Sequence, residues 1–497
     1  MYRFSYLMTY RESDQCRRRN LNYLLEQLCR DTTLEIILVE QDIASKYKGK
    51  QQANLKYIFV ENAGPFNKSW GLNIAASAAR SERLIFADSD ILISEEMLNE
   101  ISAQMDDGVD AVNPYDGLID LSQHESQALL TGTHEVQVNR TQNQLNRQAI
   151  GEHPPFCGGM FAMTETLYGL VGGMDERFEG WGGEDDAMSK RIAFFATKMT
   201  TLNSMAYHLW HQTTKDTKNS SPAYLRNLSL LTMYYERHQS FYKSLAENDA
   251  IHNASHAKYI IAEKSLLESD QTPLISCLCV TRGRLSLLAR AIECFRAQNY
   301  PHKELIVVYE ADDIETFTFL KGISNDEIKP HVIAVEPKRS LGELRNLSIE
   351  IASGEFICQW DDDDWYHPER LTKQLASALR QNKAASILPR WLIHQRDSDK
   401  VYCSNVRLWE GSLLCRKNIL PANYAYDKKR KGEDSKLIET LFINDQLAIE
   451  DFPELYVYCL SGENTWDHAH FEKILSASVE LSRQDAEIVK ERITHPS

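Results

Sequence analysis

The sequence predicts two tandem α/β domains joined by a helical region, and three observations lead to that prediction. The chain has 497 residues, enough for two or three domains with separate cores. Apolar strand patterns alternate with helix patterns twice, from residue 4 and again from residue 274, as in β-α-β units. In each half an asparagine precedes the first aspartate of an acidic turn by 15 residues (88 − 73 and 361 − 346). The predicted divisions are 1–220, 221–270 and 271–497.

The first half opens as a β-α-β unit. Strands are expected at 4–9, 34–40, 55–60, 83–87 and 110–114, and helices at 20–29, 69–79, 161–170 and 187–196, with one more helix capped by Ser94. The strand at 34–40 is apolar throughout, which is typical of a parallel sheet covered on both faces. Residues 120–150 are polar and lack a period, so they form either an acceptor-binding loop over the site or an insertion without a role.

A helical region follows, and a second β-α-β pattern begins after it. Residues 221–269 carry apolar residues at helical spacing, and the polar stretch 268–273 ends in a proline, which marks a domain boundary. Beyond it, strands are expected at 274–280, 304–309, 331–335 and 355–360, and helices at 285–298 and 341–352. The two halves are therefore interpreted as a divergent repeat.

Asp88 and Asp90 follow the apolar strand 83–87 and so lie at the carboxyl edge of the sheet, where open α/β folds bind ligands. Residues at i and i+2 lean to the same side, and hard oxygen ligands suit Mg²⁺ or Mn²⁺. An imidazole from His211 favours Mn²⁺. Asp185 is the candidate general base that takes a proton from an acceptor hydroxyl.

The loop before Asp185 has the composition of a sugar-binding turn. Gly182 and Gly183 allow the backbone to bend tightly beside a ligand, and Trp181 offers a flat apolar face to a sugar ring. Each motif alone has a simpler explanation: an Asp-x-Asp is more often a turn or cap, and a glycine-tryptophan turn is often only a packing feature. Their joint occurrence favours a sugar-transfer site.

Seven ordered segments of the first half resemble the β1,4-galactosyltransferase family and the related bacterial chondroitin-polymerase-type transferases. They are Tyr10-Arg11, Phe66-Asn67-Lys68, Asp88-Ser89-Asp90, Phe156-Cys157-Gly158-Gly159, Gly172 to Phe178, Gly180 to Asp186, and His208-Leu209-Trp210-His211. The resemblance implies that Asp90, His208 and His211 hold Mn²⁺ and that Asp185, beside Glu184, is catalytic. It further implies a nucleotide site of Tyr10, Arg11, Asn67, Lys68 and Asp88, with Trp181, Gly182 and Gly183 facing the acceptor.

The second half resembles the family 2 inverting glycosyltransferases. The segments in point are Val280 to Arg284, Leu344-Arg345-Asn346, and Trp360 to Leu371 with its four consecutive aspartates. The resemblance implies a nucleotide site of Thr281, Arg282, Arg345 and Asp361, a metal ligand in Asp363, and a catalytic pair in Asp434 and Glu433. His468 and His470 are alternative further ligands.

The pair at 433–434 has a competing interpretation, since it ends a charged run from Lys428, and such a run before a helix is usually only solvated. The four aspartates are harder to explain without a cation, because like charges that close repel. This half has no Trp-Gly-Gly loop, so a different sugar or linkage is expected.

Both resemblances imply the GT-A fold, a Rossmann-like α/β fold of nucleotide-diphospho-sugar transferases. They lead to the hypothesis of a bifunctional, metal-dependent, inverting hexosyltransferase with UDP-sugar donors that builds a bacterial capsule or lipopolysaccharide. One alternative is a single catalytic domain beside a glycan-binding or structural one. A nucleotidyltransferase is another, although it would not need the Trp-Gly-Gly-Glu-Asp loop.

The composition of the chain limits the classes of partner that it can bind. The net charge is −16, which argues against nucleic acid, because phosphate binding relies on clustered Lys and Arg. The first residues enter a strand pattern without a signal-peptide core, and no apolar run reaches membrane-spanning length. A cytoplasmic protein is expected, whose glycan or lipid-linked glycan acceptor brings it at most to the inner membrane face. The sequence shows no strongly basic amphipathic helix pattern that would hold it there.

Overall fold

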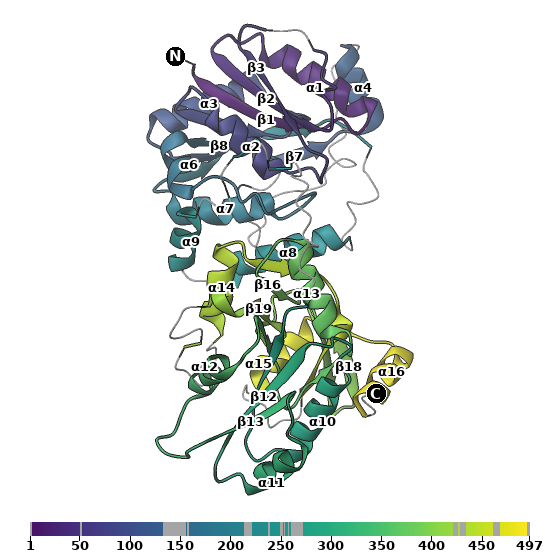
Figure 1. The fold of residues 1–497 in the computed structure, drawn as a ribbon. Coiled ribbons are helices and arrows are strands. Elements are labelled where there is room, and N and C mark those ends of the chain that lie inside the picture. Colours follow the sequence, from purple (N-terminus) through teal and green to yellow (C-terminus); the bar gives the residue numbers. More distant parts are fainter. Residues whose placement is uncertain are drawn as a thin grey trace. The chain divides into compact units, whose positions relative to one another are not determined.

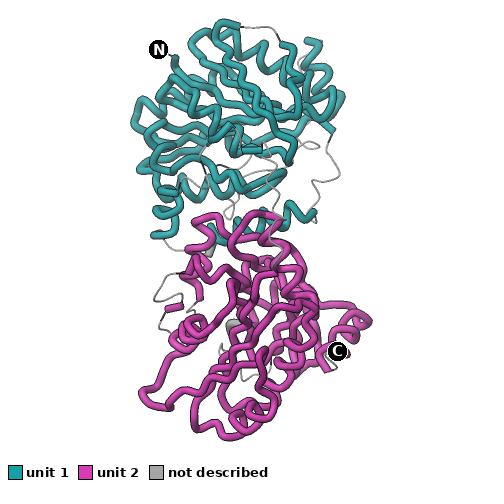
Figure 2. Tube along the Cα trace, viewed as in Figure 1, with its two compact units in different colours: residues 1–263 teal, residues 264–497 magenta. Residues whose placement is uncertain are grey.

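The computed structural model divides the chain into two compact units, residues 1–263 and 264–497 (Figure 2). It describes residues 2–49, 52–132, 156, 159–212, 221–236, 239–248, 252, 254–256, 258–259, 272–420, 426–427, 434–460 and 468–494. Each unit is considered by itself below.

The described strands of the first unit form a seven-stranded sheet in the order β3-β2-β1-β4-β8-β6-β9. These strands are β1 (Phe4–Tyr10), β2 (Leu34–Asp42), β3 (Leu55–Glu61), β4 (Arg83–Ala87), β6 (Ala111–Asn113), β8 (Met160–Thr164) and β9 (Met199–Thr201). The first four in that order are parallel, and β8 runs antiparallel to both of its neighbours. The predicted strands at 4–9, 34–40, 55–60, 83–87 and 110–114 are thereby confirmed.

Helices cover both faces of this sheet (Figure 1). Tyr6 and Met8 of β1 pack with α1 (Gln15–Leu28) and α3 (Glu95–Asp106), whereas Leu7 points to the opposite core, which contains residues of α2 (Lys68–Ser77), α6 (Glu165–Val171) and α7 (Glu184–Phe195). This alternation follows from the two-residue period of a strand. It explains why β1 and β2 are buried along their whole lengths.

The sequence interpretation differs from the structure at two places in this unit. Residues 161–170 were expected to be one helix, but 160–164 form β8, and α6 begins only after Thr164, which caps it. A short apolar run cannot be assigned to strand or helix by periodicity alone. Within the polar stretch 120–150, residues Gln123–Thr131 form α4, whose capping box joins Ser122 and Glu125. The rest of that stretch lies outside the described residues.

The region predicted as a linker contains α8 (Pro222–Glu236) and α9 (Gln239–Ala246). Both helices lie against α7, and Asn227 of α8 donates to the carbonyl oxygens of Glu179 and Trp181. These helices therefore support the loop that precedes α7 within the first unit.

The second unit repeats the strand order of the first. Its described strands form a seven-stranded sheet in the order β13-β12-β11-β14-β19-β16-β20, again with one strand, β19, antiparallel to both neighbours. The strands are β11 (Ile275–Val280), β12 (Lys303–Glu310), β13 (Ile328–Ile333), β14 (Phe356–Gln359), β16 (Ala385–Ile387), β19 (Leu414–Arg416) and β20 (Leu447–Ile449). The divergent repeat predicted from the 15-residue spacing thus corresponds to a repeated topology.

The described helices of the second unit are α10 (Leu285–Arg296), α11 (Ile314–Ile323), α12 (Leu341–Ile351), α13 (Arg370–Arg380), α14 (Ser435–Ile443), α15 (His468–Ser476) and α16 (Arg483–Thr494). The predicted helices at 285–298 and 341–352 correspond to α10 and α12. Residues Asn67 and Ser340 are the N-caps of α2 and α12, and Asn73 and Asn346 each lie six residues after their cap. The two helices are therefore equivalent position by position.

Each unit carries a smaller second sheet that begins directly after its acidic turn. In the first unit it is β5 (Ile91–Leu92), β10 (Met205–His208) and β7 (Gly117–Asp120). In the second it contains β15 (Trp365–Tyr366), β21 (Tyr456–Leu460), β17 (Leu392–Gln395), β18 (Lys400–Cys403) and β22 (Val479–Glu480). In both, the first strand pairs antiparallel with the second, and the second pairs parallel with the third.

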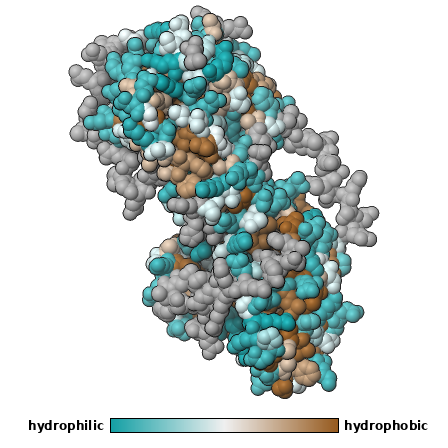
Figure 3. Space-filling model, turned by 90° about the vertical axis from the view of Figure 1, so that its left-hand side faces the viewer, coloured by the Kyte–Doolittle hydropathy of each residue, from teal (hydrophilic) through white to brown (hydrophobic). Residues whose placement is uncertain are grey.

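The face of the molecule drawn in Figure 3 is mainly hydrophilic, with smaller hydrophobic areas in both units. The exposed large apolar side chains of the described residues include Ile43 and Trp181 in the first unit and Ile314 and Val332 in the second. Within the described part of the chain, no helix combines the length and apolar character needed to cross a bilayer.

Candidate active sites

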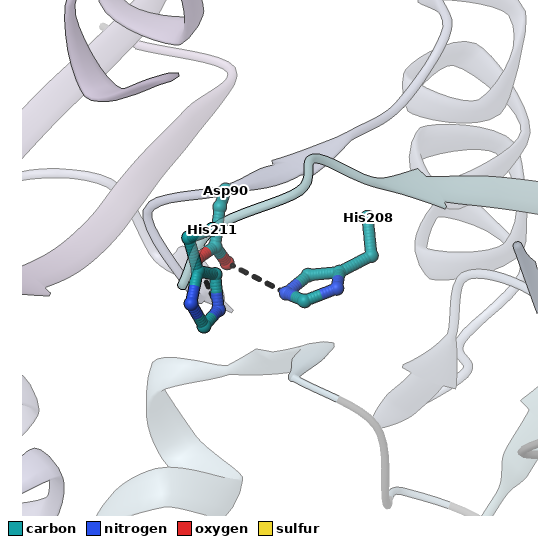
Figure 4. A group of neighbouring side chains, drawn as sticks. All are labelled: Asp90, His208 and His211. Atoms are coloured by element: carbon teal, nitrogen blue, oxygen red, sulfur yellow. Dashed lines mark ion pairs between the residues drawn. The ribbon is translucent and has the colours of Figure 1, made fainter. Parts of the chain in front are cut away.

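In the first unit, the pairing of two short strands brings two histidines close to the acidic turn. Asp90 comes directly before β5, and the antiparallel pairing of β5 with β10 sets His208 opposite Ile91. His208 Nε2 lies 3.4 Å from Asp90 Oδ1, and His211 Nε2 lies 3.5 Å from Asp90 Oδ2. Figure 4 shows both imidazoles turned toward the carboxylate. Ligand atoms of these three residues all lie within 4.8 Å of one another.

These three residues fit a divalent cation. One carboxylate and two imidazoles form a donor set that suits Mn²⁺ better than an all-oxygen set does. Arg17 lies 3.2 Å from His211 Nε2, and because arginine only donates, that nitrogen is unprotonated and accepts the bond, as a metal-ligating nitrogen must be unprotonated. Burial acts to raise the pKa of Asp90, but His208 and Arg17 outweigh it, so the pKa is lowered and the carboxylate is ionised.

Asp120, at the end of β7, is a site residue that the sequence did not reveal. His208 Nδ1 lies 2.8 Å from Asp120 Oδ1, and β7 pairs with β10 so that the two residues are directly opposite. Burial lowers the pKa of His208, but the bonds to Asp120 and Asp90 raise it to about 9 overall. A carboxylate on the outer nitrogen of a ligating histidine fixes its orientation and tautomer. The only signal in the sequence is a polar residue ending a short apolar run.

Asp120→Ala is expected to weaken Mn²⁺ binding about 10- to 100-fold, the usual cost of losing such an outer partner. The reason is that His208 would lose the bond that orients its ring. Calorimetric titration of Mn²⁺ into the protein measures the change, with Asp116→Ala as a control, because Asp116 is an exposed aspartate on the same segment. Equal affinities of the Asp120→Ala variant and the unmutated protein would contradict this role.

A second cluster of charges lies around Lys68, the first residue of α2. Its Nζ atom is 2.8 Å from Asp88 Oδ1, 3.0 Å from both oxygens of Asp185, and 4.0 Å from Glu184 Oε1. Burial disfavours the charge of Lys68, but Asp185, Asp88 and Glu184 outweigh it and raise the lysine pKa well above its usual value. The candidate base Asp185 and the nucleotide-site candidates Lys68 and Asp88 therefore lie together.

The acids at the start of α7 are held in a partly desolvated environment. Burial, followed by the charge of Asp185, raises the pKa of Glu184 to about 7. Burial also raises the pKa of Asp185, against the opposing effect of Lys68. A carboxylate with a raised pKa at the edge of a sheet is a suitable proton acceptor near neutral pH.

The turn into α7 requires glycine. Gly182 and Gly183 have φ angles of 99° and 92°, and a Cβ atom at either would lie 2.9 Å from an aromatic carbon, of Tyr224 and Phe178 respectively. Trp181 is 54% exposed and stacks on Tyr224 of α8, with ring centroids 5.4 Å apart. The turn therefore carries an exposed aromatic ring four residues before Asp185 in the sequence.

Three of the predicted nucleotide ligands are engaged by the protein itself. Arg11 donates to the carbonyl oxygens of residues 41, 62 and 64. Asn67 caps α2 and donates to the carbonyl of Glu176 and to the Tyr259 hydroxyl. Tyr10 is buried, and its hydroxyl lies 3.5 Å from Glu12. In this arrangement these side chains shape the loops around the site.

The acidic turn of the second unit, Asp361 to Asp364, is tied to a threonine and to three arginines, one of which, Arg290, donates to the backbone carbonyl of Asp363. Arg284 lies 2.7 Å from Asp362 Oδ1 and 2.9 Å from Asp363 Oδ2. Thr281 donates to Asp362 over 2.6 Å, and Arg345 lies 3.0 Å from Asp361 Oδ1. Arg282 instead pairs with Glu310 at 2.9 Å, on the neighbouring strand β12. Burial and the neighbouring aspartates raise the pKa of Asp362 to about 7, although Arg284 opposes them.

Asp364, the last of the four, has a structural role. Its carboxylate is fully buried, accepts a bond from the Tyr456 hydroxyl, and accepts the Cys459 backbone N–H over 2.9 Å. Burial raises its pKa well above the usual value. Asp364 therefore joins the turn to β21, which explains one of the four aspartates without a cation.

Asp364→Ala is expected to lower the free energy of unfolding by about 2–4 kcal/mol, because it leaves two buried donors without an acceptor. Urea titration of the full chain measures the effect. Asp312→Ala is the matched control, since Asp312 is 52% exposed and contacts Arg282 only at 3.6 Å. A loss for Asp364→Ala no larger than that of the control would contradict the role.

The strand register also shows that the second unit lacks the equivalents of two site residues of the first unit. Val457 occupies the position on β21 that His208 occupies on β10, opposite the first residue of the short strand. Leu392 correspondingly takes the position of Asp120. Among the residues that the structure describes, the Asp90 group alone brings three such ligand atoms together. Any cation at the second turn therefore needs a different set of ligands.

The candidate base of the second unit lies beside its acidic turn. Asp434 is the N-cap of α14, and its Oδ2 is 3.6 Å from Arg345 Nη1. Glu433 lies outside the described residues. His468 and His470 belong to the first turn of α15, and their side chains are likewise outside the described set. Arg345 thus connects Asp361 with Asp434, as Lys68 connects Asp88 with Asp185.

Comparison with known families shows which family the chain belongs to. The model of "Glycosyl transferase family 2" matches residues 7–166 and 276–444, one segment in each unit and more than half of the chain together. The chain belongs to glycosyl transferase family 2. The predicted fold class, tandem α/β units of GT-A type, is confirmed by this family match and the two equivalent sheets. A family 2 assignment was expected only for the second half, and it extends to the first.

The first unit carries a second family signal. A model described as "N-terminal domain of galactosyltransferase" matches residues 148–212, which include the glycine-tryptophan turn, the start of α7 and both histidines. The galactosyltransferase-like resemblance of this unit is thereby supported over that segment.

Several curated proteins are similar to parts of this family 2 chain. Human chondroitin sulfate N-acetylgalactosaminyltransferase 2 is 28% identical over 163 residues, 31% of this chain and 28% of the relative. The putative teichuronic acid biosynthesis glycosyltransferase TuaG of Bacillus subtilis is 25% identical over 114 residues, 23% of this chain and 45% of the relative. The chain thus spans less than half the length of these two relatives.

Among solved structures, TarS of S. aureus in complex with UDP-GlcNAc is similar, with a TM-score of 0.32 and 15% sequence identity. The similarity covers 44% of this chain and 65% of TarS.

Proposed function

We propose that this family 2 chain is a bifunctional, metal-dependent, inverting glycosyltransferase with one active site in each unit. The observation that supports it best is the recurrence of one arrangement at the carboxyl edge of both sheets. In each unit a buried, positively charged side chain lies between the first aspartate of the acidic turn and an aspartate at the start of a helix. These residues are Asp88, Lys68 and Asp185 in the first unit, and Asp361, Arg345 and Asp434 in the second.

The chemistry assigned to each site is a single in-line displacement. The acceptor hydroxyl oxygen forms a bond to the anomeric carbon of the donor sugar, and its proton passes to Asp185 or Asp434. The bond from the anomeric carbon to the phosphate oxygen breaks, and its electron pair leaves with the nucleoside diphosphate. One displacement of this kind inverts the anomeric configuration.

In the first unit Asp90, His208 and His211 would hold Mn²⁺, or Mg²⁺ as the alternative. In the second, Asp363 would contribute a ligand, with His468 or His470 as further candidates. A bound divalent cation supplies positive charge to the diphosphate. Asp88 and Asp361, whose side chains are 37% and 28% exposed, are placed to contact the nucleotide.

We assign UDP-sugars as donors and a glycan or lipid-linked glycan as the acceptor, which would bring the chain to the inner membrane face. The glycan acceptor is supported by the names of two relatives, human chondroitin sulfate N-acetylgalactosaminyltransferase 2 and the putative teichuronic acid biosynthesis glycosyltransferase TuaG. Capsule or lipopolysaccharide synthesis is the corresponding role for a two-site enzyme. Trp181, Gly182 and Gly183 would face the acceptor in the first unit.

A second candidate function is one catalytic unit beside a glycan-binding unit. The favouring observation is that Val457 and Leu392 replace His208 and Asp120 in the second unit. Under this hypothesis the second acidic turn binds a sugar or nucleotide without transferring it.

Incubation of the intact protein with a panel of nucleotide sugars, Mn²⁺ and oligosaccharide acceptors tests the proposal. The expected products are a glycosylated acceptor and free nucleoside diphosphate, with two different donors consumed. Release of pyrophosphate would indicate a nucleotidyltransferase, and use of a single donor would favour the one-site alternative.

A further inference from the structure

Lys68 has the geometry of a bridge. Its ammonium group has three protons, and three carboxylate oxygens, one of Asp88 and two of Asp185, lie within 3.0 Å of Nζ. The residue is only 9% exposed. In this arrangement the ammonium group of Lys68 is directed at two carboxylates, those of Asp88 and Asp185, and it joins them.

Arg345 forms the corresponding bridge in the second unit from a different position. It lies directly before Asn346, the equivalent of Asn73, whereas Lys68 lies directly after the N-cap of α2. Leu72 takes the place of Arg345 in the first unit, and Leu341 takes the place of Lys68 in the second. The positive charge therefore occupies the same place in both units, between the acidic turn and the candidate base, but it comes from different turns of the equivalent helices α2 and α12. A purely accidental pair would not be expected twice.

We infer that Lys68 and Arg345 are positioning residues that keep the base carboxylates Asp185 and Asp434 ionised and oriented toward the acceptor hydroxyl. This inference rests on the proposed transferase function, and it assigns the Lys68 and Arg345 side chains a role other than binding the nucleotide. Because each bridge also contacts the first aspartate of the acidic turn, it links the donor side of the site to the base. The proton of the acceptor hydroxyl passes to the carboxylate as the bond to the anomeric carbon forms and the nucleoside diphosphate leaves.

The charges around Asp185 explain why a positively charged side chain is needed beside it. Lys68 faces it from α2, Asp88 from the end of β4, and Glu184 and Asp186 lie on its own helix α7. Three negative groups and one positive group therefore surround the base. Burial raises the pKa of Asp185, and Lys68 exerts the largest opposing effect. Without Lys68 the carboxyl would hold its proton at a higher pH and could not accept another.

The test compares Lys68→Met and Lys68→Arg in the intact protein, with transfer by the first site measured from pH 5.5 to 9.5. For Lys68→Met, the acid limb of the kcat profile is expected to move up by about one pH unit, and kcat at pH values on that limb to fall about tenfold, since one pKa unit is a tenfold change in ionisation. The donor KM should change less than about threefold. Lys68→Arg should restore most of kcat and return the acid limb toward its original place, because it restores the charge.

Lys46→Met is the matched control. Lys46 also pairs with a carboxylate, that of Asp42 at 2.7 Å, but contacts none of the groups around Asp185, so its profile should be unchanged. A Lys68→Met variant with a raised donor KM and an unmoved acid limb would assign the lysine to the diphosphate and overturn the inference. A uniform loss of kcat at every pH would mean a structural role and would also overturn it.

The second unit provides an independent variant if Lys68→Met fails to fold. Arg345→Met should move the acid limb of the second donor's profile upward, and Arg345→Lys should move it back. The outcomes separate the two hypotheses: an unmutated protein that transfers no sugar contradicts the proposed function. An active protein whose profiles do not shift in either variant contradicts only the bridging role.

Discussion

Asp90→Ala is expected to reduce transfer by the first site at least about 10³-fold, while the second donor is used at an unchanged rate. Asp90 is 3% exposed and contributes the carboxylate between His208 and His211. Its loss leaves two imidazoles, beside the cationic Arg17, to hold a divalent cation. Cation stabilisation of the departing charge is worth several kcal/mol, and about 4 kcal/mol corresponds to a factor of 10³.

The reciprocal variant is Asp363→Ala, for which the second donor should be lost and the first retained. Asp106→Ala controls for the removal of a carboxylate from the first unit, because Asp106 is 63% exposed and pairs with Arg83, at the opposite end of β4 from the acidic turn. Radiolabelled donors distinguish the two activities in one sample. If Asp90→Ala abolished use of both donors, the sites would not be independent. If Asp363→Ala changed nothing, the second unit would be a binding module.

The sequence was sufficient to predict features that depend on local order. Parallel strands place their carboxyl ends at one edge, so an apolar run followed by Asp88 and Asp90 could be located on the sheet without a structure. The same reasoning located Asp361, and the shared spacing to Asn73 and Asn346 anticipated a topology that recurs strand by strand.

Features that depend on register or on distant packing could not be predicted in this way. Asp120 meets His208 because β7 and β10 pair in one register, and a shift of one residue would turn Asp120 to the other face. Lys68 and Asp185 are 117 residues apart in sequence. Lys68 was assigned to the nucleotide site, and only the fold reveals its contact with the candidate base. The strand at 160–164 was mistaken for helix because a buried strand and a buried helix share the same composition.

Asp185→Asn is expected to lower kcat of the first site by about 10²- to 10⁴-fold, the usual contribution of a general base, with little change in donor KM. Asparagine has nearly the same shape and keeps one oxygen for Lys68, but it cannot take the acceptor proton. Asp434→Asn should have the same effect on the second donor. Glu184 is the competing candidate, since it lies 4.0 Å from the same lysine and its pKa is raised to about 7.

Glu184→Gln decides between these two acids. If Asp185 is the base, removal of the adjacent negative charge lowers the pKa of Asp185, because like charges disfavour ionisation. The acid limb of the kcat profile should then move to lower pH while kcat on the plateau is largely kept. This shift is opposite in direction to the one expected for Lys68→Met. The acid limb of the unmutated protein should therefore lie between those of the two variants. If Glu184 is the base, its loss removes the proton acceptor itself, and kcat falls at every pH without a shift.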